Sequence, residues 1–253
     1  MKKACLWTAV VALSPISAAA LPAQLLIDDF LDAQSVAASG GPPDSQADAS
    51  AAPGALGGFR DLRVLKLFEG ATGGVVRIEA NPAAEDELRF STTPTSRGLG
   101  YVRWDGGDNV GLQRDLGGLD FVIYDALELG VTFSDVGGPV GVLFARADGA
   151  AEAQATIDVP GAIPANSDQV LSLPLLDANF VTTGGTLASV LADVGAIELA
   201  IDGSERAEEN WSANFDFVRL TRAQAQIPLP APALMLLAAV GAFGAFRLRW
   251  RNA

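Results

Sequence analysis

The chain has 253 residues, of which 30 are acidic and 17 basic, with no histidine and a single cysteine. Its net charge of −13 makes nucleic acid and anionic lipid surfaces poor partners, because binding either of them needs a basic patch. The absence of histidine excludes a Ser-His-Asp triad and the usual zinc ligand, and one cysteine excludes an intramolecular disulfide.

Residues 1–20 have the order of a secretory signal peptide. Two lysines follow the initial methionine, an apolar run continues to Leu13, and small residues lead to three alanines that end at Ala20. We predict cleavage after Ala20 and export of the rest of the chain. Because Cys5 lies in this segment, the mature protein is expected to have no thiol.

Residues 21–226 form the central segment, which we predict to be one folded domain. It contains all 30 acidic residues and 12 of the 17 basic ones, so its net charge is about −18. Short apolar runs alternate with Gly, Pro, Asn and Asp, a pattern typical of β-strands joined by turns. The predicted strands are Leu25–Phe30, Leu62–Phe68, Val75–Glu79, Glu87–Phe90, Gly100–Trp104, Phe121–Tyr124, Glu128–Phe133, Val140–Arg146, Ala155–Val159, Val170–Leu173, Ala196–Ile201 and Phe215–Thr221.

This pattern predicts an all-β fold, a two-sheet antiparallel β-sandwich of the jelly-roll type. A parallel α/β sheet is not expected, since no long helices alternate with the strands. Thr186 to Asp193 predicts a short helix with Thr186 as its N-cap. Residues 37–58 are rich in Ala, Gly, Ser, Pro and Asp, and we predict a mobile loop because this composition buries little apolar surface.

The C-terminal segment, residues 227–251, has the features of a membrane-spanning helix with a basic end. Ile227 to Phe246 carries no charge and is long enough to cross a bilayer. Arg247, Arg249 and Arg251 follow it, and basic residues stay on the cytoplasmic side. The sequence therefore predicts a C-terminal transmembrane helix that leaves the central segment outside the inner membrane.

The order of parts in this tail also resembles a known class of bacterial sorting signal. The tail begins with Ile227, Pro228, Leu229, Pro230 and Ala231, continues as an apolar helix and ends in the arginine cluster. This order resembles the PEP-CTERM signals, in the VPLPA-CTERM variant, with isoleucine in place of valine. The resemblance implies recognition by an exosortase, a membrane cysteine transpeptidase, and delivery of the passenger to the cell surface or its release. A plain membrane anchor is the alternative.

Short motifs of the central segment resemble the jelly-roll passenger domains that are found ahead of such tails. Those passenger domains are similar to carbohydrate-binding modules. The motifs are Asp28–Phe30, Gly57–Val64, Val102–Gly106, Val194–Leu199 and Phe215–Val218. Two functions follow from this resemblance. The first is a structural or polysaccharide-binding surface or matrix protein, and the second is a secreted carbohydrate-active enzyme. We favour the first, without catalytic residues.

Jelly rolls resembling this chain place the first and last strands side by side, which predicts a structural Ca²⁺ between Asp28, Asp29 and Asp216. Residues 105–109, Asp-Gly-Gly-Asp-Asn, are interpreted as a hairpin turn rather than a Ca²⁺ loop. The acidic stretch 202–209 is interpreted as a solvated loop rather than a catalytic pair. Tyr101, Trp104 and Trp211 are candidates either for an aromatic sugar platform or for the core.

Overall fold

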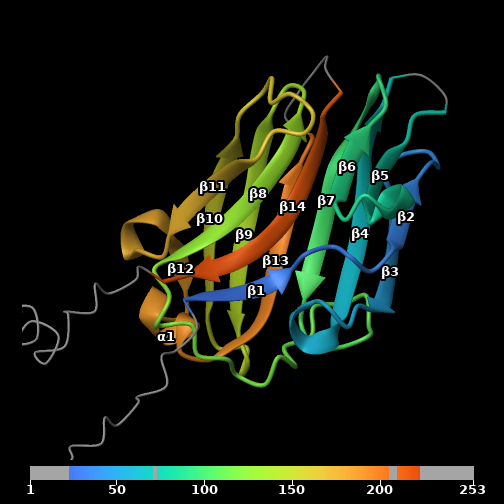
Figure 1. Cartoon of the computed structure of the whole chain (residues 1–253). Coiled ribbons are helices and arrows are strands. Elements are labelled where there is room, and N and C mark those ends of the chain that lie inside the picture. The colour runs from blue at the N-terminus through green and yellow to red at the C-terminus, as the bar shows by residue number, and fades with distance from the viewer. Residues whose placement is uncertain (1–22, 71–72, 205–209, 223–253) are drawn as a thin grey trace, which may run out of the picture.

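The computed structural model describes residues 23–70, 73–204 and 210–222, and in these ranges the chain forms two antiparallel β-sheets packed face to face (Figure 1). Sheet A consists of β1 (Gln24–Asp28), β2 (Gln34–Ala38), β5 (Val76–Ala80), β6 (Leu88–Thr92), β8 (Ala126–Ser134), β11 (Gln169–Pro174) and β14 (Ser212–Thr221). Sheet B consists of β3 (Asp44–Ala51), β4 (Phe59–Glu69), β7 (Ser96–Trp104), β9 (Gly138–Arg146), β10 (Glu152–Val159), β12 (Val181–Thr183) and β13 (Val194–Asp202).

The strand order is β11-β8-β14-β6-β5-β2 in sheet A and β12-β10-β9-β13-β7-β4-β3 in sheet B. β14 pairs with β8 along one side, while β6 and β1 share its other side. The short helix α1 (Leu187–Leu191) begins after Thr186, whose side chain accepts a hydrogen bond from the Ser189 amide. Single 3₁₀ turns lie at Leu56–Gly58, Pro82–Ala84 and Asp177–Asn179. Among the described residues, no helix is long and apolar enough to cross a membrane.

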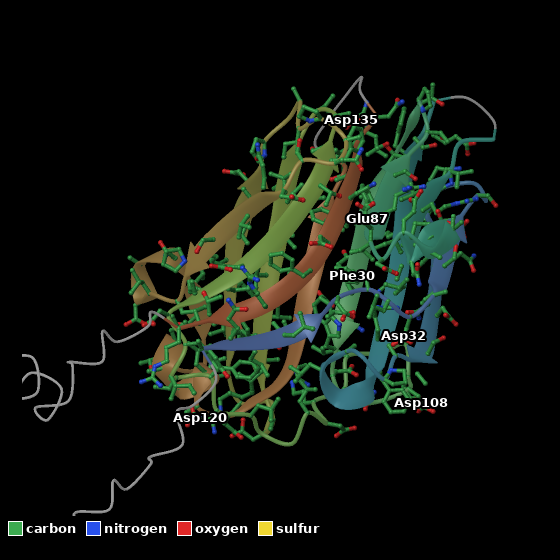
Figure 2. All side chains as sticks on the ribbon, viewed as in Figure 1. Phe30, Asp32, Glu87, Asp108, Asp120 and Asp135 are labelled. Atoms are coloured by element: carbon green, nitrogen blue, oxygen red, sulfur yellow. The ribbon has the colours of Figure 1, made fainter. Side chains whose placement is uncertain are left out.

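The core lies between the sheets because alternate residues of each strand point to opposite faces. In β5, for example, Val76, Ile78 and Ala80 are buried and the two residues between them are more exposed. Trp104 and Trp211 are completely buried, and the Trp211 ring packs edge-on against Phe90 with 5.6 Å between ring centroids. Carboxylates lie at both ends of the sandwich, with Asp135 at one end and Asp108 and Asp120 at the other (Figure 2).

The two-sheet antiparallel sandwich and the short helix after Thr186 confirm the sequence predictions, but β2, β3 and β12 are strands that the sequence analysis does not predict, and one predicted strand is absent. Residues 44–51, within the predicted mobile loop, form strand β3, and every residue of β3 pairs with a residue of β4. β3 is an edge strand with largely exposed side chains, so main-chain hydrogen bonds rather than apolar burial hold it. Phe121–Tyr124 is not a strand. Its aromatic rings fill the core from a turn. The predicted terminal segments 1–20 and 227–251 lie outside the described residues.

A buried ion pair joins the two sheets. The Nη1 atom of Arg60, on β4, lies 3.1 and 3.0 Å from the two carboxylate oxygens of Asp28, at the end of β1. Trp104 Nε1 donates to Asp28 Oδ2 over 2.7 Å, and the Phe30 amide donates to Oδ1 over 2.8 Å. Burial raises the pKa of Asp28, and Arg60, Trp104 and Phe30 oppose this shift.

Gln34, on β2, extends the network to the sheet edges. Its Oε1 accepts from Arg60 Nε over 3.1 Å, and its Nε2 donates to the Arg60 carbonyl and to Asp48 on β3. The remaining Arg60 nitrogen donates to the Asp32 carbonyl. The guanidinium of Arg60, on sheet B, therefore binds groups of β1 and β2 in sheet A. Asp28 and Gln34 in turn bind Trp104 on β7 and Asp48 on β3, so the network ties β1 and β2 to β3, β4 and β7.

We predict that Asp28→Asn lowers the free energy of unfolding by about 3–5 kcal/mol, because it leaves the buried Arg60 charge without its carboxylate. Adding Arg60→Met to Asp28→Asn removes that charge. The double variant should therefore lose less free energy of unfolding than the sum of the losses in the two single variants. Urea unfolding of the purified protein measures both effects.

Glu79→Gln is the control, since Glu79 pairs with Arg77 on the surface, where the Arg77 side chain is 47% exposed. This substitution is expected to cost less than about 1 kcal/mol. Equal losses from Asp28→Asn and Glu79→Gln would contradict a structural role for the buried pair.

Candidate functional site

The outer face of sheet B carries two rows of residues that lie directly opposite one another across neighbouring strands. Residues paired in this way share one face of the sheet and approach closely. The first, here called the groove row, is Thr156, Gly141, Ala200, Tyr101 and Arg63. The second, here called the charged row, is Gln154, Leu143, Glu198, Arg103 and Asp61. Five strands therefore contribute to one continuous surface.

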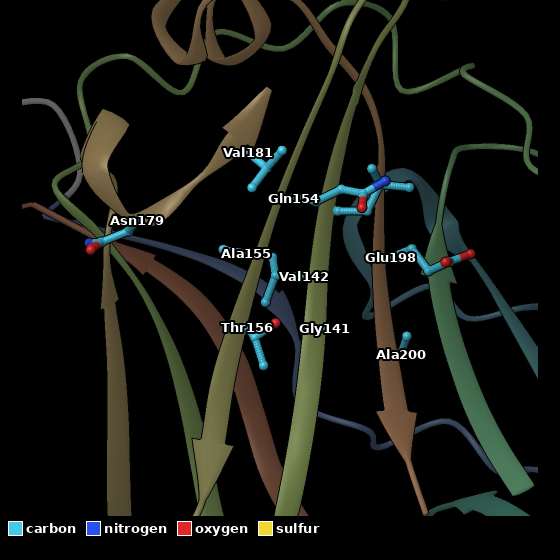
Figure 3. Close-up of a pocket in the computed structure, with 10 residues that line it drawn as sticks. Gly141, Val142, Gln154, Ala155, Thr156, Asn179, Val181, Glu198 and Ala200 are labelled. Carbon is cyan, nitrogen blue, oxygen red and sulfur yellow. The ribbon is translucent and has the colours of Figure 1, made fainter. Parts of the chain in front are cut away.

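An open groove of about 500 Å³ lies over β9, β10 and β13 on this face. Figure 3 shows the side chains around it, which come from these strands and from the Asn179–Val181 segment. It is lined by Gly141, Val142, Leu143, Gln154, Ala155, Thr156, Asn179, Val181, Glu198 and Ala200. Amide, hydroxyl and carboxylate groups thus surround a floor of small residues, with the apolar Val181, 76% exposed, at one edge.

Gly141 keeps the floor of the groove low although its backbone does not require glycine. A Cβ atom at this position would lie 3.5 Å from the Ala200 Cβ, an ordinary contact distance, and the Gly141 backbone has no left-handed φ. A larger residue would fit at Gly141 and would fill the groove. The combination of Gly141 with Ala200 leaves a flat strip between Thr156 and Tyr101.

Arg103 fixes Glu198 at the side of the groove. Its Nε lies 2.8 Å from Glu198 Oε2, and its Nη2 contacts the same oxygen. Arg103 Nη1 also donates to the Val110 carbonyl over 3.2 Å. Val110 belongs to the 105–115 loop, which Asp105 shapes by accepting hydrogen bonds from the Gly107 and Gln113 amides. The loop and the groove therefore share one arginine.

Asp61 lies opposite Arg103 in the charged row and is only 4% exposed. Neither of its carboxylate oxygens has a hydrogen-bond partner among the described residues. Burial raises the pKa of Asp61 to about 7, Asp105 adds to this shift, and Arg103 opposes it. Asp61 is therefore partly protonated at neutral pH, which reduces the negative charge on this face.

Tyr101 and Arg63 continue the groove row beyond Ala200. The Arg63 guanidinium carbon lies 5.7 Å from the centroid of the Tyr101 ring, and Arg63 Nε donates to Ser45 Oγ over 3.2 Å. The same two strands place Arg97 over Phe68, with 4.8 Å between guanidinium carbon and ring centroid. One pair of cationic and aromatic side chains therefore lies at the end of the groove row, and a second pair lies farther along the same two strands.

The three aromatic candidates from the sequence do not form one platform. Trp104 and Trp211 are completely buried, and only Tyr101 lies on the outer face. Three positions separate Tyr101 from Trp104 in the same strand, so the two side chains point to opposite faces. The core alternative therefore holds for both tryptophans.

The structure assigns the predicted Ca²⁺ ligands to different surroundings. β1 and β14 are paired, as expected, but Asp28 points inward and binds Arg60. Asp29 and Asp216 remain outside this ion pair. Burial raises the pKa of Asp216, with Glu87 and Asp168 adding to the shift. No group of three or more acidic residues in the described part of the chain is arranged to hold a metal ion. Cation binding by Asp29 and Asp216 stays a prediction.

The structure also bears on the two acidic segments, residues 105–109 and 202–209. Residues 105–109 are not a tight hairpin turn, because the chain passes from β7 in sheet B to β8 in sheet A through a long loop. Asp202 accepts hydrogen bonds from Ser204, while residues 205–209 lie outside the described part. Sequence reasoning missed Gln154, Thr156 and Glu198, although their alternation with buried residues marked them as outward-facing.

No protein-family model matches the chain, and no curated protein is significantly similar to it in sequence. Among solved structures, it is similar to the family 11 carbohydrate-binding module of a cellulosomal cellulase of Clostridium thermocellum. The TM-score is 0.40, with 11% identity over 83% of this chain and 100% of the module. For a family 11 module of this bacterium in complex with a β-1,3-1,4-mixed-linked tetrasaccharide, the TM-score is 0.39 and the sequence identity 11%, over 79% of this chain and 96% of the module.

An agarase crystal structure gives a TM-score of 0.44 with 12% identity, over 81% of this chain and 25% of the agarase. At these values the similarity concerns a β-sandwich architecture and identifies no ligand for this chain.

We predict that Asp61→Asn stabilises the protein increasingly as the pH rises. The folded-state pKa of Asp61, about 7, lies above its ordinary value of 3.8, so folding favours the protonated form. Ionised Asp61 therefore destabilises the folded state as the pH rises through the window from about 4 to about 7. Urea unfolding should show an advantage of Asp61→Asn that is about 2–3 kcal/mol larger at pH 8 than at pH 5.

Asp158→Asn provides the matched control, since Asp158 is an exposed outward residue of β10. As a substitution of an exposed surface residue, it should change stability by no more than about 0.5 kcal/mol. An advantage of Asp61→Asn that is equal at pH 5 and pH 8 would show that Asp61 ionises normally.

Proposed function

We propose that this domain binds polysaccharide in the groove on the outer face of sheet B. The observation that carries the proposal is the flat Gly141 and Ala200 floor between polar side chains and Tyr101. Sugar rings combine flat apolar faces with hydroxyl edges, so they pack on small or aromatic residues while amide and carboxylate groups take hydrogen bonds. Gln154, Thr156 and Glu198 offer such groups.

Binding fits this groove better than hydrolysis. A glycosidase needs two carboxylates, about 5–5.5 Å apart in retaining enzymes and about 6.5–9.5 Å in inverting ones. Among the described residues that line the groove, Glu198 is the only carboxylate, and Arg103 holds it in an ion pair. The groove lies on an open sheet face, which suits a long polymer.

The ends of the chain support a role outside the cell. Residues 1–20 have the pattern of a signal peptide, and the Ile227–Ala231 motif with its apolar helix and arginines resembles a PEP-CTERM sorting signal. In this proposal the protein is exported, held by its tail in the inner membrane, and processed by an exosortase for delivery to the surface or matrix. Extracellular polysaccharide is then the ligand it meets.

We predict that Gly141→Leu weakens polysaccharide binding at least about tenfold, because the new side chain fills the groove without removing a polar group. Isothermal titration calorimetry against a panel of soluble polysaccharides, both neutral and acidic, measures this. The panel should include mixed-linkage β-glucan, agarose oligosaccharides and polygalacturonate.

Gly41→Leu is the matched control, since a Cβ atom at Gly41 would have no neighbour within 4 Å and the residue lies between β2 and β3. It should bind as the unchanged protein does. Absence of binding to every polysaccharide, or binding that Gly141→Leu leaves intact, would contradict the proposal.

We predict that the mature protein lacks residues 1–20 and, in cells with an exosortase, the tail beyond the Pro228–Ala231 motif. Intact-mass analysis of the secreted or surface-released protein measures both ends. A double variant, Pro228→Ala with Pro230→Ala, should keep its tail. A released product that still contains Phe246 would rule out processing, and a product that begins at Met1 would rule out export.

A further inference from the structure

We infer that the polysaccharide bound in this groove is acidic and that Arg63 binds its carboxylate or sulfate groups. This inference rests on the proposed function and adds the chemical class of the ligand. It depends on the position of Arg63 in the groove row, on its contact with Tyr101, and on its lack of an acidic partner.

The groove row leads directly from the floor of the groove to Arg63. Tyr101 lies opposite Ala200, and Arg63 lies opposite Tyr101. Two strand spacings separate Ala200 from Arg63, a distance of about 10 Å, which is the length of a disaccharide. A chain that packs on Gly141 and Ala200 and continues over Tyr101 therefore brings its next sugar to the guanidinium of Arg63.

Arg63 differs from most of the surface arginines in the described part of the chain. Six of those form salt bridges with carboxylates: Arg77, Arg89, Arg103, Arg114, Arg146 and Arg219. Arg63 forms none with any carboxylate in the described part of the chain, although the protein has 30 acidic residues. Only its Nε has a hydrogen-bond partner there, Ser45, so its Nη atoms are available for a ligand.

The Tyr101 ring orients this arginine for an anion. A guanidinium over an aromatic ring keeps its planar fork of donors directed sideways, and the fork matches two carboxylate oxygens. Of the nearby carboxylates, Glu198 binds Arg103 and Asp202 accepts from Ser204. Asp61, the preceding outward residue of β4, forms no salt bridge with Arg63 and is only 4% exposed. The groove therefore presents a cation on a protein whose net charge is −13.

The test compares each acidic polysaccharide with the same polymer after chemical reduction of its carboxylates. Polygalacturonate and alginate, each with its carboxyl-reduced form, are titrated into the purified protein at about 0.15 M salt. The acidic form should bind at least about tenfold more tightly than the reduced form. Arg63→Gln should remove this difference, and Arg63→Lys should keep part of it, because lysine retains the charge without the planar fork.

Arg77→Gln is the control, because Arg77 lies on β5 in sheet A and its loss removes the same charge far from the groove. It should leave the preference unchanged. If the neutral forms bind as tightly as the acidic ones, and if Gly141→Leu abolishes this binding, the inference is overturned and the proposed function stands. A preference that survives Arg63→Gln would also overturn it. Failure of all forms to bind would remove the proposed function and this inference together.

Discussion

The buried pair of Arg60 and Asp28 is the constraint on which the arrangement of both sheets depends. A buried charge is costly unless its donors have partners, and here Asp28 on β1, Gln34 on β2 and the Asp32 carbonyl supply the partners of this guanidinium from β4. Because β4 alternates its faces, an inward Arg60 requires an outward Asp61 and, after Leu62, an outward Arg63. The core network thereby also orients the surface at the edge of the groove.

The groove combines a low floor with an unusual charge balance. Gly141 occupies a position where a Cβ atom would make only ordinary contacts, so the structure leaves space that the local backbone does not require. Two acidic groups beside the groove carry little free charge, because Glu198 is paired with Arg103 and Asp61 is buried with its pKa raised to about 7. A strongly acidic protein thus has one surface on which an extended, hydroxyl-rich and negatively charged chain can lie.

The sequence was sufficient for the sandwich and insufficient for the site, for physical reasons. Apolar alternation within a few residues predicts strands such as Val140–Arg146, whereas β3 is held by main-chain pairing that composition does not reveal. The opposite faces of Tyr101 and Trp104 follow from their odd spacing in one strand. The contact of Gly141 with Ala200, and that of Arg60 with Asp28, depend on strand register between distant segments, which no local pattern encodes.

A map of where polysaccharide contacts the protein tests binding in the groove most directly. Hydrogen–deuterium exchange with and without saturating polygalacturonate would report the amides that the ligand protects. We predict slower exchange on β9, β10 and β13 and at Tyr101 and Arg63, with sheet A unchanged. Protection confined to β5, β8 or β14, on the opposite sheet, would contradict it.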